Sequence, residues 1–183
     1  MSSIAIRFKP TYSRNLEIGS GPSKRNGWTT LDMCSGADIY WDLRVRLPFK
    51  ESSFEKVYCS HVLEHFSFHE LVYLLRDVCR ILKPGGQFLI CVPDATFFID
   101  AYLGKRDPKI LMQYKPAISS MNSMDILNYI FYMEGHHKFM FDSKNLAFHC
   151  QAAGFSKCVA RAFDPTLDSA SRDYESLYMI CEK

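Results

Sequence analysis

A glycine-rich turn near the start of the chain carries the first residues that could bind a ligand. Asn15–Ile18 has the composition of a short strand, and Gly19, Ser20 and Gly21 follow it directly. In open α/β sheets, ligands bind at the carboxyl ends of strands, where glycine lets them approach the backbone without meeting a Cβ atom. This turn therefore predicts a site for a nucleotide or a nucleoside.

Two acidic residues end the next two predicted strands. Asp32 ends the segment 28–32, and Asp42 ends the segment 37–42. A carboxylate at the end of the second strand can accept hydrogen bonds from both hydroxyls of a ribose. Asp42 can face the amino group of an adenine, with the backbone amide of Leu43 toward a ring nitrogen. The alternative for Asp32 is a helix cap or a place in a solvated loop.

The turn lacks the features that bind phosphate groups. Lys24 stands where a dinucleotide-binding turn has its third glycine, and the pattern of a phosphate-binding loop is absent. The segment between Gly21 and Trp28 is too short for a full helix, so Asp32 follows Gly19 sooner than the roughly 20 residues of a complete unit. An adenosyl ligand without phosphates suits this turn better than NAD or ATP.

Strand and helix patterns alternate along the chain, which predicts a parallel α/β sheet. Ser67 and Glu70 have the spacing of a capping box, and apolar residues then recur at helical intervals until Lys83–Gly86 ends the helix. The apolar run Phe88–Val92 suits a strand buried on both faces. The loop between the last two strands is short, which favours an antiparallel pair. Further helices are expected at 124–133 and 143–153, the last two strands near 155–163 and 174–181, and breaks at Pro108 and Pro116.

Motifs spread over residues 14–163 form one joint pattern. They are Leu16–Gly21, Gly27–Trp28, Leu31–Asp32, Asp42–Leu43, Leu47–Phe49, Ser53–Val57, His61–His65, Arg80–Gly86, Gly135–Phe139 and Ala153–Phe155. Together they resemble the class I S-adenosylmethionine-dependent methyltransferases, in particular the type 11 (UbiE/UbiG-like) branch. The departure from that family is the shortened segment after Gly21.

The resemblance implies a fold, a cofactor and its binding residues. The fold is Rossmann-like, a seven-stranded and mostly parallel sheet with helices on both faces and an antiparallel last strand. The cofactor is S-adenosyl-L-methionine, with Asp32 on the ribose hydroxyls, Met33 beside the adenine and Asp42 and Leu43 at its edge. The remaining implied cofactor-binding residues are Glu17, Gly19, Ser20 and Gly21 at the turn and Ser60 and His61 along the methionine arm.

Three histidines are candidates for removing a proton from an acceptor. His136 and His137 follow an aromatic segment, and His65 lies beyond the fourth strand, on the side of the expected cofactor. Histidine titrates near neutral pH, which suits this role. His137 is preferred because it precedes the return of the chain from the insertion to the core. Each histidine has the alternative of a structural hydrogen bond.

The remaining histidine and cysteine patterns predict no metal site and no disulfide framework. His61, His65 and His69 recur at every fourth position, but a new helix is expected to begin at Ser67, so the three need not share a face. The 7 cysteines are odd in number and mostly lie in apolar runs, which is typical of reduced, buried thiols.

The composition describes an ordinary globular domain. Hydrophobic residues make up 48% of the chain and the net charge is +2, so neither disorder nor a strongly basic nucleic-acid surface is indicated. No apolar stretch has the roughly 18 residues of a membrane span, and no signal-peptide core is found. A single cytoplasmic methyltransferase domain over 1–183 is expected, with an arm at 1–13 and an insertion or lid at 95–142 that contributes to the substrate site.

The expected function is methyl transfer, at oxygen, to a small molecule or to a glycan or lipid precursor. The expected substrate partners are therefore small molecules or glycans, without membrane or nucleic acid, and a homodimer or a partner subunit is the alternative source of a complete substrate site. A catalytically inactive methyltransferase-like binding or scaffold subunit is the alternative function. A nucleic-acid methyltransferase is less favoured because the net charge is small.

Overall fold

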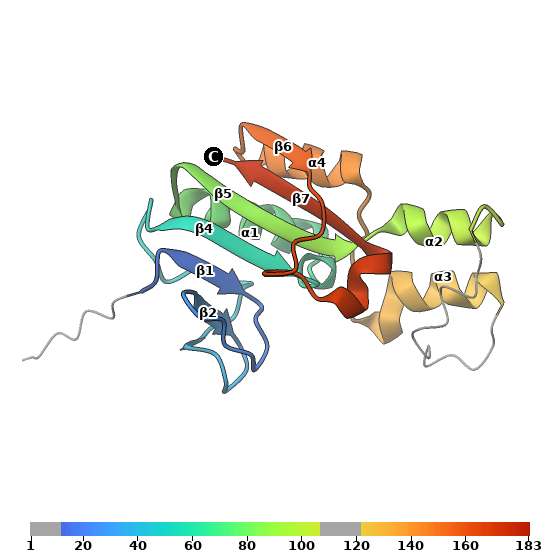
Figure 1. Cartoon of the computed structure of the whole chain (residues 1–183), viewed down its shortest axis with the longest axis horizontal. Coiled ribbons are helices and arrows are strands. Elements are labelled where there is room, and N and C mark those ends of the chain that lie inside the picture. The colour runs from blue at the N-terminus through green and yellow to red at the C-terminus, as the bar shows by residue number, and fades with distance from the viewer. Residues whose placement is uncertain (1–11, 107–121) are drawn as a thin grey trace, which may run out of the picture.

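The computed structural model describes residues 12–106 and 122–183 and contains one seven-stranded sheet (Figure 1). The order of the strands is β3-β2-β1-β4-β5-β7-β6. The strands are β1 Asn15–Ile18, β2 Thr29–Asp32, β3 Ile39–Tyr40, β4 Phe54–Ser60, β5 Leu82–Pro93, β6 Lys157–Ala160 and β7 Ser176–Glu182. The helices are α1 Phe68–Ile81, α2 Ala95–Tyr102, α3 Ser123–Tyr132 and α4 Ser143–Ala152, with short 3₁₀ turns at η1 Leu63–His65, η3 Met133–Gly135 and η4 Ala170–Glu175.

The pairing of the strands confirms the predicted fold class. β1 to β5 are parallel, whereas β7 runs antiparallel to both β5 and β6. From β1 the chain continues to β2 and β3 on one side, and from β4 to β5 on the other. The carboxyl ends of β1 and β4 therefore form the switch point where a ligand site is expected in this type of sheet.

Helices α1 and α4 cover one face of the sheet with an apolar core. Helix α1 begins at the predicted capping box, in which the carboxylate of Glu70 accepts a hydrogen bond of 2.8 Å from the backbone amide of Ser67. Its apolar side chains recur every three or four residues, so they all face the sheet. This core includes Leu71, Leu74, Leu75 and Val78 of α1, Leu146 and Cys150 of α4, and Leu16, Ile18, Val57, Cys59, Phe88 and Ile90 of the strands.

The opposite face is covered by residues 161–175, which cross in front of the sheet in Figure 1. We call this segment the strap. Asp168 attaches the strap to the sheet, because its carboxylate accepts a hydrogen bond of 3.0 Å from the hydroxyl of Tyr58 on β4. The same carboxylate pairs with Arg161 of the strap at 2.6 Å. No helix connects β1 to β2 within the described residues 19–28. Arg25 from that connection instead donates to the carbonyl oxygens of residues 166 and 167, at 2.7 and 2.8 Å.

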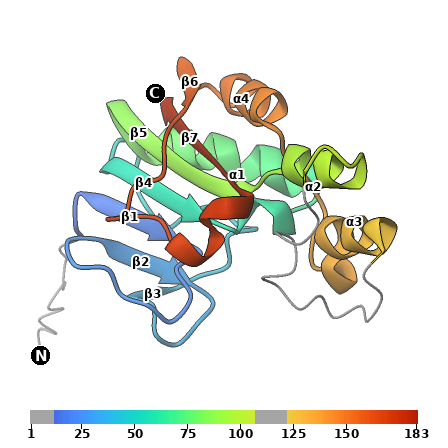
Figure 2. The same cartoon turned by 45° about the vertical axis from the view of Figure 1, so that its right-hand side comes forward.

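Helices α2 and α3 lie side by side beyond the carboxyl end of β5 and the amino end of β7 (Figure 2). They form a second, smaller core from Phe97, Phe98, Ala101, Ile126 and Ile130. Both belong to the expected insertion. The two breaks expected at Pro108 and Pro116 lie outside the described residues.

Several predicted boundaries were wrong by a few residues. Helix α1 ends at Ile81, before Lys83–Gly86, because Leu82 has an extended backbone and already pairs with Phe54 as part of β5. Helix α4 ends at Ala152, one residue early, and β6 is limited to Lys157–Ala160, where it pairs with β7. Pairing between strands ends these elements, and local patterns do not reveal it.

The expectation that all cysteines are reduced was also wrong. Cys158 and Cys181 form a disulfide that joins β6 to β7. The two residues lie opposite each other in the antiparallel register, with their Cα atoms 4.1 Å apart. Because 23 residues separate them in the chain, only the pairing of the strands brings them together.

In the part of the chain that the structure describes, no helix is long and apolar enough to span a membrane.

Candidate functional site

A cavity of about 620 Å³ opens at the carboxyl ends of β1, β2 and β4, beside the switch point. Its volume lies within the range of small-molecule and cofactor sites. Among the predicted cofactor-binding residues, those that line it are Gly19, Gly21, Asp32, Met33, Asp42, Leu43 and His61. Trp41, Arg44, Val62, His65, Phe66, Gly135, His136 and Lys138 complete the lining. We call it the first cavity.

The two glycines of the turn have different environments. Both have positive φ angles, 67° at Gly19 and 61° at Gly21, which favours glycine at each position. A Cβ atom at Gly19 would collide with the side chain of Val62, whereas a Cβ atom at Gly21 would meet nothing within 4 Å. The open backbone that a ligand can approach is therefore at Gly21, and Gly19 makes room for a side chain of the protein.

Asp32 lies directly beside this turn. Its Oδ2 atom accepts a hydrogen bond of 2.9 Å from the backbone amide of Gly21, which holds the carboxylate at the edge of the cavity. Within the described ranges, Oδ1 of Asp32 accepts no hydrogen bond. That oxygen remains for a ligand hydroxyl, as the ribose of an adenosyl group would require.

The third strand end contributes a salt bridge and an aromatic ring. Asp42 accepts hydrogen bonds from the Arg44 guanidinium at 2.7 to 3.0 Å, and these bonds hold the pKa of the Asp42 carboxyl below its usual range. The indole nitrogen of Trp41 donates to the carbonyl oxygen of Arg46 at 3.2 Å, which fixes the ring at the cavity. Sequence reasoning missed Trp41 and Arg44, although both are immediate neighbours of the predicted Asp42–Leu43 pair.

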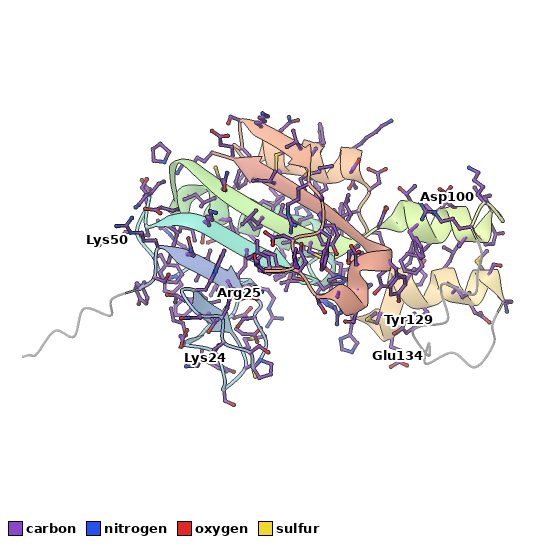
Figure 3. The ribbon with its side chains drawn as sticks, in the orientation of Figure 1. Lys24, Arg25, Lys50, Asp100, Tyr129 and Glu134 are labelled. Atoms are coloured by element: carbon purple, nitrogen blue, oxygen red, sulfur yellow. A yellow bond between two sulfur atoms is a disulfide. The ribbon has the colours of Figure 1, made fainter. Side chains whose placement is uncertain are left out.

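Three predicted cofactor-binding residues do not line the first cavity. Glu17 points to the strap side of the sheet, where its carboxylate pairs with Arg25 at 2.8 Å; Figure 3 labels Arg25 next to β1. The hydroxyl of Ser20 donates to the carbonyl oxygen of Gly21 at 3.2 Å. Ser60 ends β4 but is absent from the cavity wall. Their assignment as cofactor ligands stays a prediction.

A second cavity, of about 300 Å³, adjoins the first, and the two share His61 and His65. Ionisable and polar side chains dominate its wall. The lining residues are His61, Glu64, His65, Pro93, Tyr129, Ile130, Met133, His137, Arg172 and Glu175. They come from the turn after β4, from the end of β5, from α3 and its continuation, and from the strap. The second cavity therefore exists only because segments far apart in sequence meet.

His61 stands between the two cavities in a strained conformation. Its φ angle is 53°, in the left-handed region that costs a residue with a side chain of order 1–3 kcal/mol. Its Nε2 atom lies 3.0 Å from the hydroxyl oxygen of Ser176. Burial lowers the pKa of the imidazole to about 3, so the ring is neutral at physiological pH.

Glu64 is a buried carboxyl group in the same wall, with an exposed fraction of 1%. Its Oε1 atom lies 3.6 Å from Nδ1 of His61, and its Oε2 atom has no hydrogen-bond partner among the described residues. Burial raises the pKa of this carboxyl to about 8. Glu64 was not among the predicted site residues, although it lies within the His61–His65 motif. A buried unpaired carboxyl group is rare and is a marker of a functional site.

The three candidate catalytic histidines meet at the junction of the cavities. The rings of His65 and His137 are 5.0 Å apart, and Nδ1 of His65 lies 3.0 Å from the carbonyl oxygen of His136. His137 is buried and lines the second cavity, with its Nδ1 atom 2.6 Å from the carbonyl oxygen of Ile130. Burial lowers the pKa of His137. His136 lines the first cavity. The structure thus brings the three together, and a catalytic role for each stays a prediction.

Comparison with known proteins connects this site to methyltransferases. Residues 35–90 match the family described as "Methyltransferase domain". A demethylmenaquinone methyltransferase of Streptomyces griseus is 32% identical over 120 residues, which cover 64% of this chain and 49% of the relative. The curated relatives that the chain matches are covered over 8% to 49% of their own lengths.

Solved structures share the fold at low sequence identity. Burkholderia thailandensis 1,6-didemethyltoxoflavin-N1-methyltransferase, with its substrate and S-adenosylhomocysteine bound, superposes with a TM-score of 0.57 at 15% identity, covering 92% of this chain and 70% of that one. A chain from the Haloferax volcanii complex of the Trm112 methyltransferase activator superposes with a TM-score of 0.57 at 14% identity, covering 94% of this chain and 83% of that one. The family resemblance predicted from the sequence, to class I methyltransferases of the UbiE-like type, is confirmed.

Proposed function

We propose that this relative of the UbiE-like methyltransferases transfers the methyl group of S-adenosylmethionine to an oxygen of a small molecule or of a glycan or lipid precursor. The observation that carries the proposal is the pair of adjoining cavities at the switch point of the sheet. One has open backbone and a carboxylate suited to an adenosyl group. The other is lined by histidines and carboxyl groups suited to an acceptor.

The residues of the first cavity fit the cofactor. The cofactor would lie along the strand ends, with its ribose on the free oxygen of Asp32 and its methionine part beside the open backbone of Gly21. Trp41 and Met33 offer apolar surface to the adenine, and Asp42 and Leu43 lie at its edge. The bound cofactor supplies a methyl group that its own sulfonium charge has already activated.

The protein's contribution is to orient the acceptor and take up its proton. The two cavities meet at His61 and His65, so an acceptor in the second cavity would point its nucleophile toward the first. Such positioning supplies much of the rate enhancement when no other activation is needed. His137, His136 and His65 are the candidate proton acceptors. We also assign residues 95–142 the role of a lid, because α3 and the segment after it supply Tyr129, Ile130 and Met133 to the second cavity.

The acceptor class rests on the size and polarity of the second cavity. A volume of about 300 Å³ suits a small molecule or the end group of a larger one. Arg172 and Glu175 face it with opposite charges, which suits a polar acceptor better than an apolar one. The similar Burkholderia enzyme holds a small-molecule substrate together with S-adenosylhomocysteine, which supports this choice. A cytoplasmic location and a single domain over 1–183 stay predictions.

The second candidate is a scaffold subunit without activity of its own. Two observations favour it: the connection between β1 and β2 forms no helix, and Arg44 already pairs with Asp42 at the expected adenine edge. The fold neighbour from the Haloferax complex with a methyltransferase activator illustrates how such a domain can depend on a partner.

Calorimetry with S-adenosylmethionine and S-adenosylhomocysteine tests the proposal. We expect both ligands to bind the wild-type protein and to bind Asp32→Ala markedly more weakly. Asp100→Ala, on the outer part of α2 and labelled in Figure 3, is the matched control and should bind like wild type. Absence of binding to folded wild-type protein would favour the scaffold, and equal binding by Asp32→Ala would refute the placement of the ribose.

A further inference from the structure

We propose that Glu64, His65 and His137 bind a divalent first-row transition-metal ion such as Zn²⁺ in the wall of the second cavity. The inference rests on the proposed function in one respect, because it assigns the ion to the cavity given to the acceptor. One ligand atom from each of the three side chains lies within 4.8 Å of the others. Two imidazoles and one carboxylate are the ligand set of many zinc sites that keep a position open for water or substrate.

The hydrogen bonds of the two histidines leave one nitrogen of each ring free to bind an ion. Nδ1 of His65 lies 3.0 Å from one backbone carbonyl oxygen, and Nδ1 of His137 lies 2.6 Å from another. A carbonyl oxygen can only accept, so in each neutral ring Nδ1 carries the proton and Nε2 keeps its lone pair. Histidines that bind metals have this arrangement, in which a backbone carbonyl fixes the tautomer and the orientation of the ring.

Glu64 supplies the carboxyl group of the proposed set and the unsatisfied atom. Its side chain is 1% exposed, and its Oε2 atom has no partner in the described part of the chain. Its Oε1 atom lies 4.0 Å from Nε2 of His65, so the carboxyl group faces the nitrogen that keeps the lone pair. Burying a carboxyl oxygen without a partner is costly, and a bound cation would remove that cost.

The three groups need to move only slightly to reach bonding geometry. Bonds of about 2.0 to 2.2 Å to nitrogen and oxygen place the ligand atoms of a tetrahedral ion about 3.5 Å apart, so the side chains would draw together by about an ångström. The position left open would face the second cavity, beside Arg172 and Glu175. A hard oxygen of the acceptor, such as a hydroxyl group, is the ligand that this position suits.

The proposed set differs from the metal reading weighed on the sequence. His61, His65 and His69 recur at every fourth position, but His69 lies on α1 beside Phe68 and lines a separate cavity with Tyr73 and Arg76. His137 enters instead, from a segment that follows α3. The proposed set therefore shares only His65 with the sequence triplet, and the fold brings its distant member, His137, to Glu64 and His65.

Titration with Co²⁺ tests the site directly, because cobalt replaces zinc and absorbs visible light when bound. We expect one equivalent of Co²⁺ to bind the chelator-treated wild-type protein and to give the d–d absorption of a low-coordinate site. Glu64→Gln and His137→Asn should weaken binding by about 100-fold or more. The Asn side chain can still donate to the carbonyl oxygen of Ile130 but lacks the ligating nitrogen, so this variant keeps the local structure. His69→Ala, outside the cluster, should bind like wild type.

Several results would overturn the proposal. One is the absence of saturable binding to the wild-type protein. Another is unchanged binding by both Glu64→Gln and His137→Asn. A third is a thiolate-to-cobalt charge-transfer band that Cys150→Ser abolishes, since Cys150 lies close to Cys158 and Cys181, which would offer two further thiolates once their disulfide is reduced. If circular dichroism shows that Glu64→Gln or His137→Asn does not fold, cobalt binding by the other of these two variants tests the site.

The same samples separate this proposal from the proposed function. Calorimetry with S-adenosylmethionine, in chelator, depends on the first cavity alone, whereas cobalt binding depends on the second. Cobalt binding without cofactor binding would refute the methyltransferase proposal and keep the metal site. Cofactor binding without cobalt binding would refute the metal site and keep the methyltransferase proposal.

Discussion

The two cavities differ in what their walls are made of. The first is lined by residues that directly follow strands, such as Gly21 after β1, Asp32 at the end of β2 and Leu43 after β3. The second takes its polar groups from the turn after β4, the segment after α3 and the strap. The ends of β1, β2 and β3 therefore contribute to the cofactor side alone, whereas the turn after β4 and the segment after α3 contribute to both sides and the strap to the acceptor side alone.

This difference shows where the chain can vary its chemistry. The carboxyl edge of the parallel sheet is fixed by strand order, so any sequence with this fold presents a ligand site there. The wall of the second cavity depends on how the insertion and the strap pack, and neither is required by the sheet. A common cofactor can thus be combined with different acceptors.

The largest expected effect separates the cavities by activity. His137→Asn should lower the turnover number by about 10² to 10⁴, the range for losing an acid–base group, because it removes the Nε2 atom, which would take up the acceptor's proton or, with the proposed ion bound, hold that ion. The affinity for S-adenosylmethionine should stay unchanged. Steady-state kinetics with an identified acceptor, beside calorimetry, measures both quantities. Turnover equal to wild type would remove His137 from the mechanism, and His69→Ala is the control.

The next prediction concerns the strap that closes the second cavity. Asp168 and Arg161 form a buried ion pair, with exposed fractions of 1% and 12% for their side chains. Asp168→Asn should lower the free energy of unfolding by about 3 kcal/mol, the cost of breaking such a pair. Urea titration at pH 7 measures this change. Asp164→Asn, nearby on the strap, is the control and should change stability little, because asparagine keeps the side-chain oxygen that accepts hydrogen bonds from Thr166.

The same variant gives a pH dependence of defined sign. Burial raises the pKa of Asp168, but hydrogen bonds from Arg161 and from the backbone amide of Asp164 outweigh burial, so the pKa lies below the ordinary value of 3.8. A carboxyl with a lowered pKa stabilises the fold above its unfolded pKa and loses this contribution as the pH falls through the folded value. The stability difference between wild type and Asp168→Asn should therefore shrink below pH 3.8. A constant difference would contradict the assignment.

Asp32→Ala should act on the first cavity alone. Losing hydrogen bonds to a charged acceptor costs about 1.5 to 3 kcal/mol, so the affinity for S-adenosylmethionine should fall by about 10- to 150-fold. With saturating cofactor, turnover should remain close to wild type, in contrast to His137→Asn. If Asp32→Ala lowered turnover but left the affinity for S-adenosylmethionine unchanged, Asp32 would belong to the acceptor side and not to the cofactor side.

The smallest effect is expected at Gly21. Alanine there must adopt a φ angle near 61°, which costs about 1 to 2 kcal/mol, but its Cβ meets no atom of the protein within 4 Å. Gly21→Ala should therefore fold, with cofactor affinity reduced severalfold because the new methyl group enters the first cavity. Gly19→Ala is the comparison variant and should unfold more easily, since its Cβ would collide with Val62. Thermal denaturation and calorimetry distinguish the two.

The sequence by itself determined the class of the fold and the strand ends that form the first cavity. Gly21 and Asp32 act over short distances, because each lies at or within three residues of the end of its own strand and needs only the parallel register to meet the other. The capping box of α1 and the antiparallel last pair are local in the same sense. Such features follow from patterns of neighbouring residues.

Only the tertiary structure decided which groups surround Glu17, Glu64 and His137. Glu17, whose role at the cofactor stays a prediction, pairs with Arg25, which also binds the strap. Glu64 is buried against histidines 61 and 65 and lies close to His137, which is 73 positions further along the chain than Glu64. Burial and charge pairing depend on segments that meet only after folding, and no spacing within the sequence encodes them.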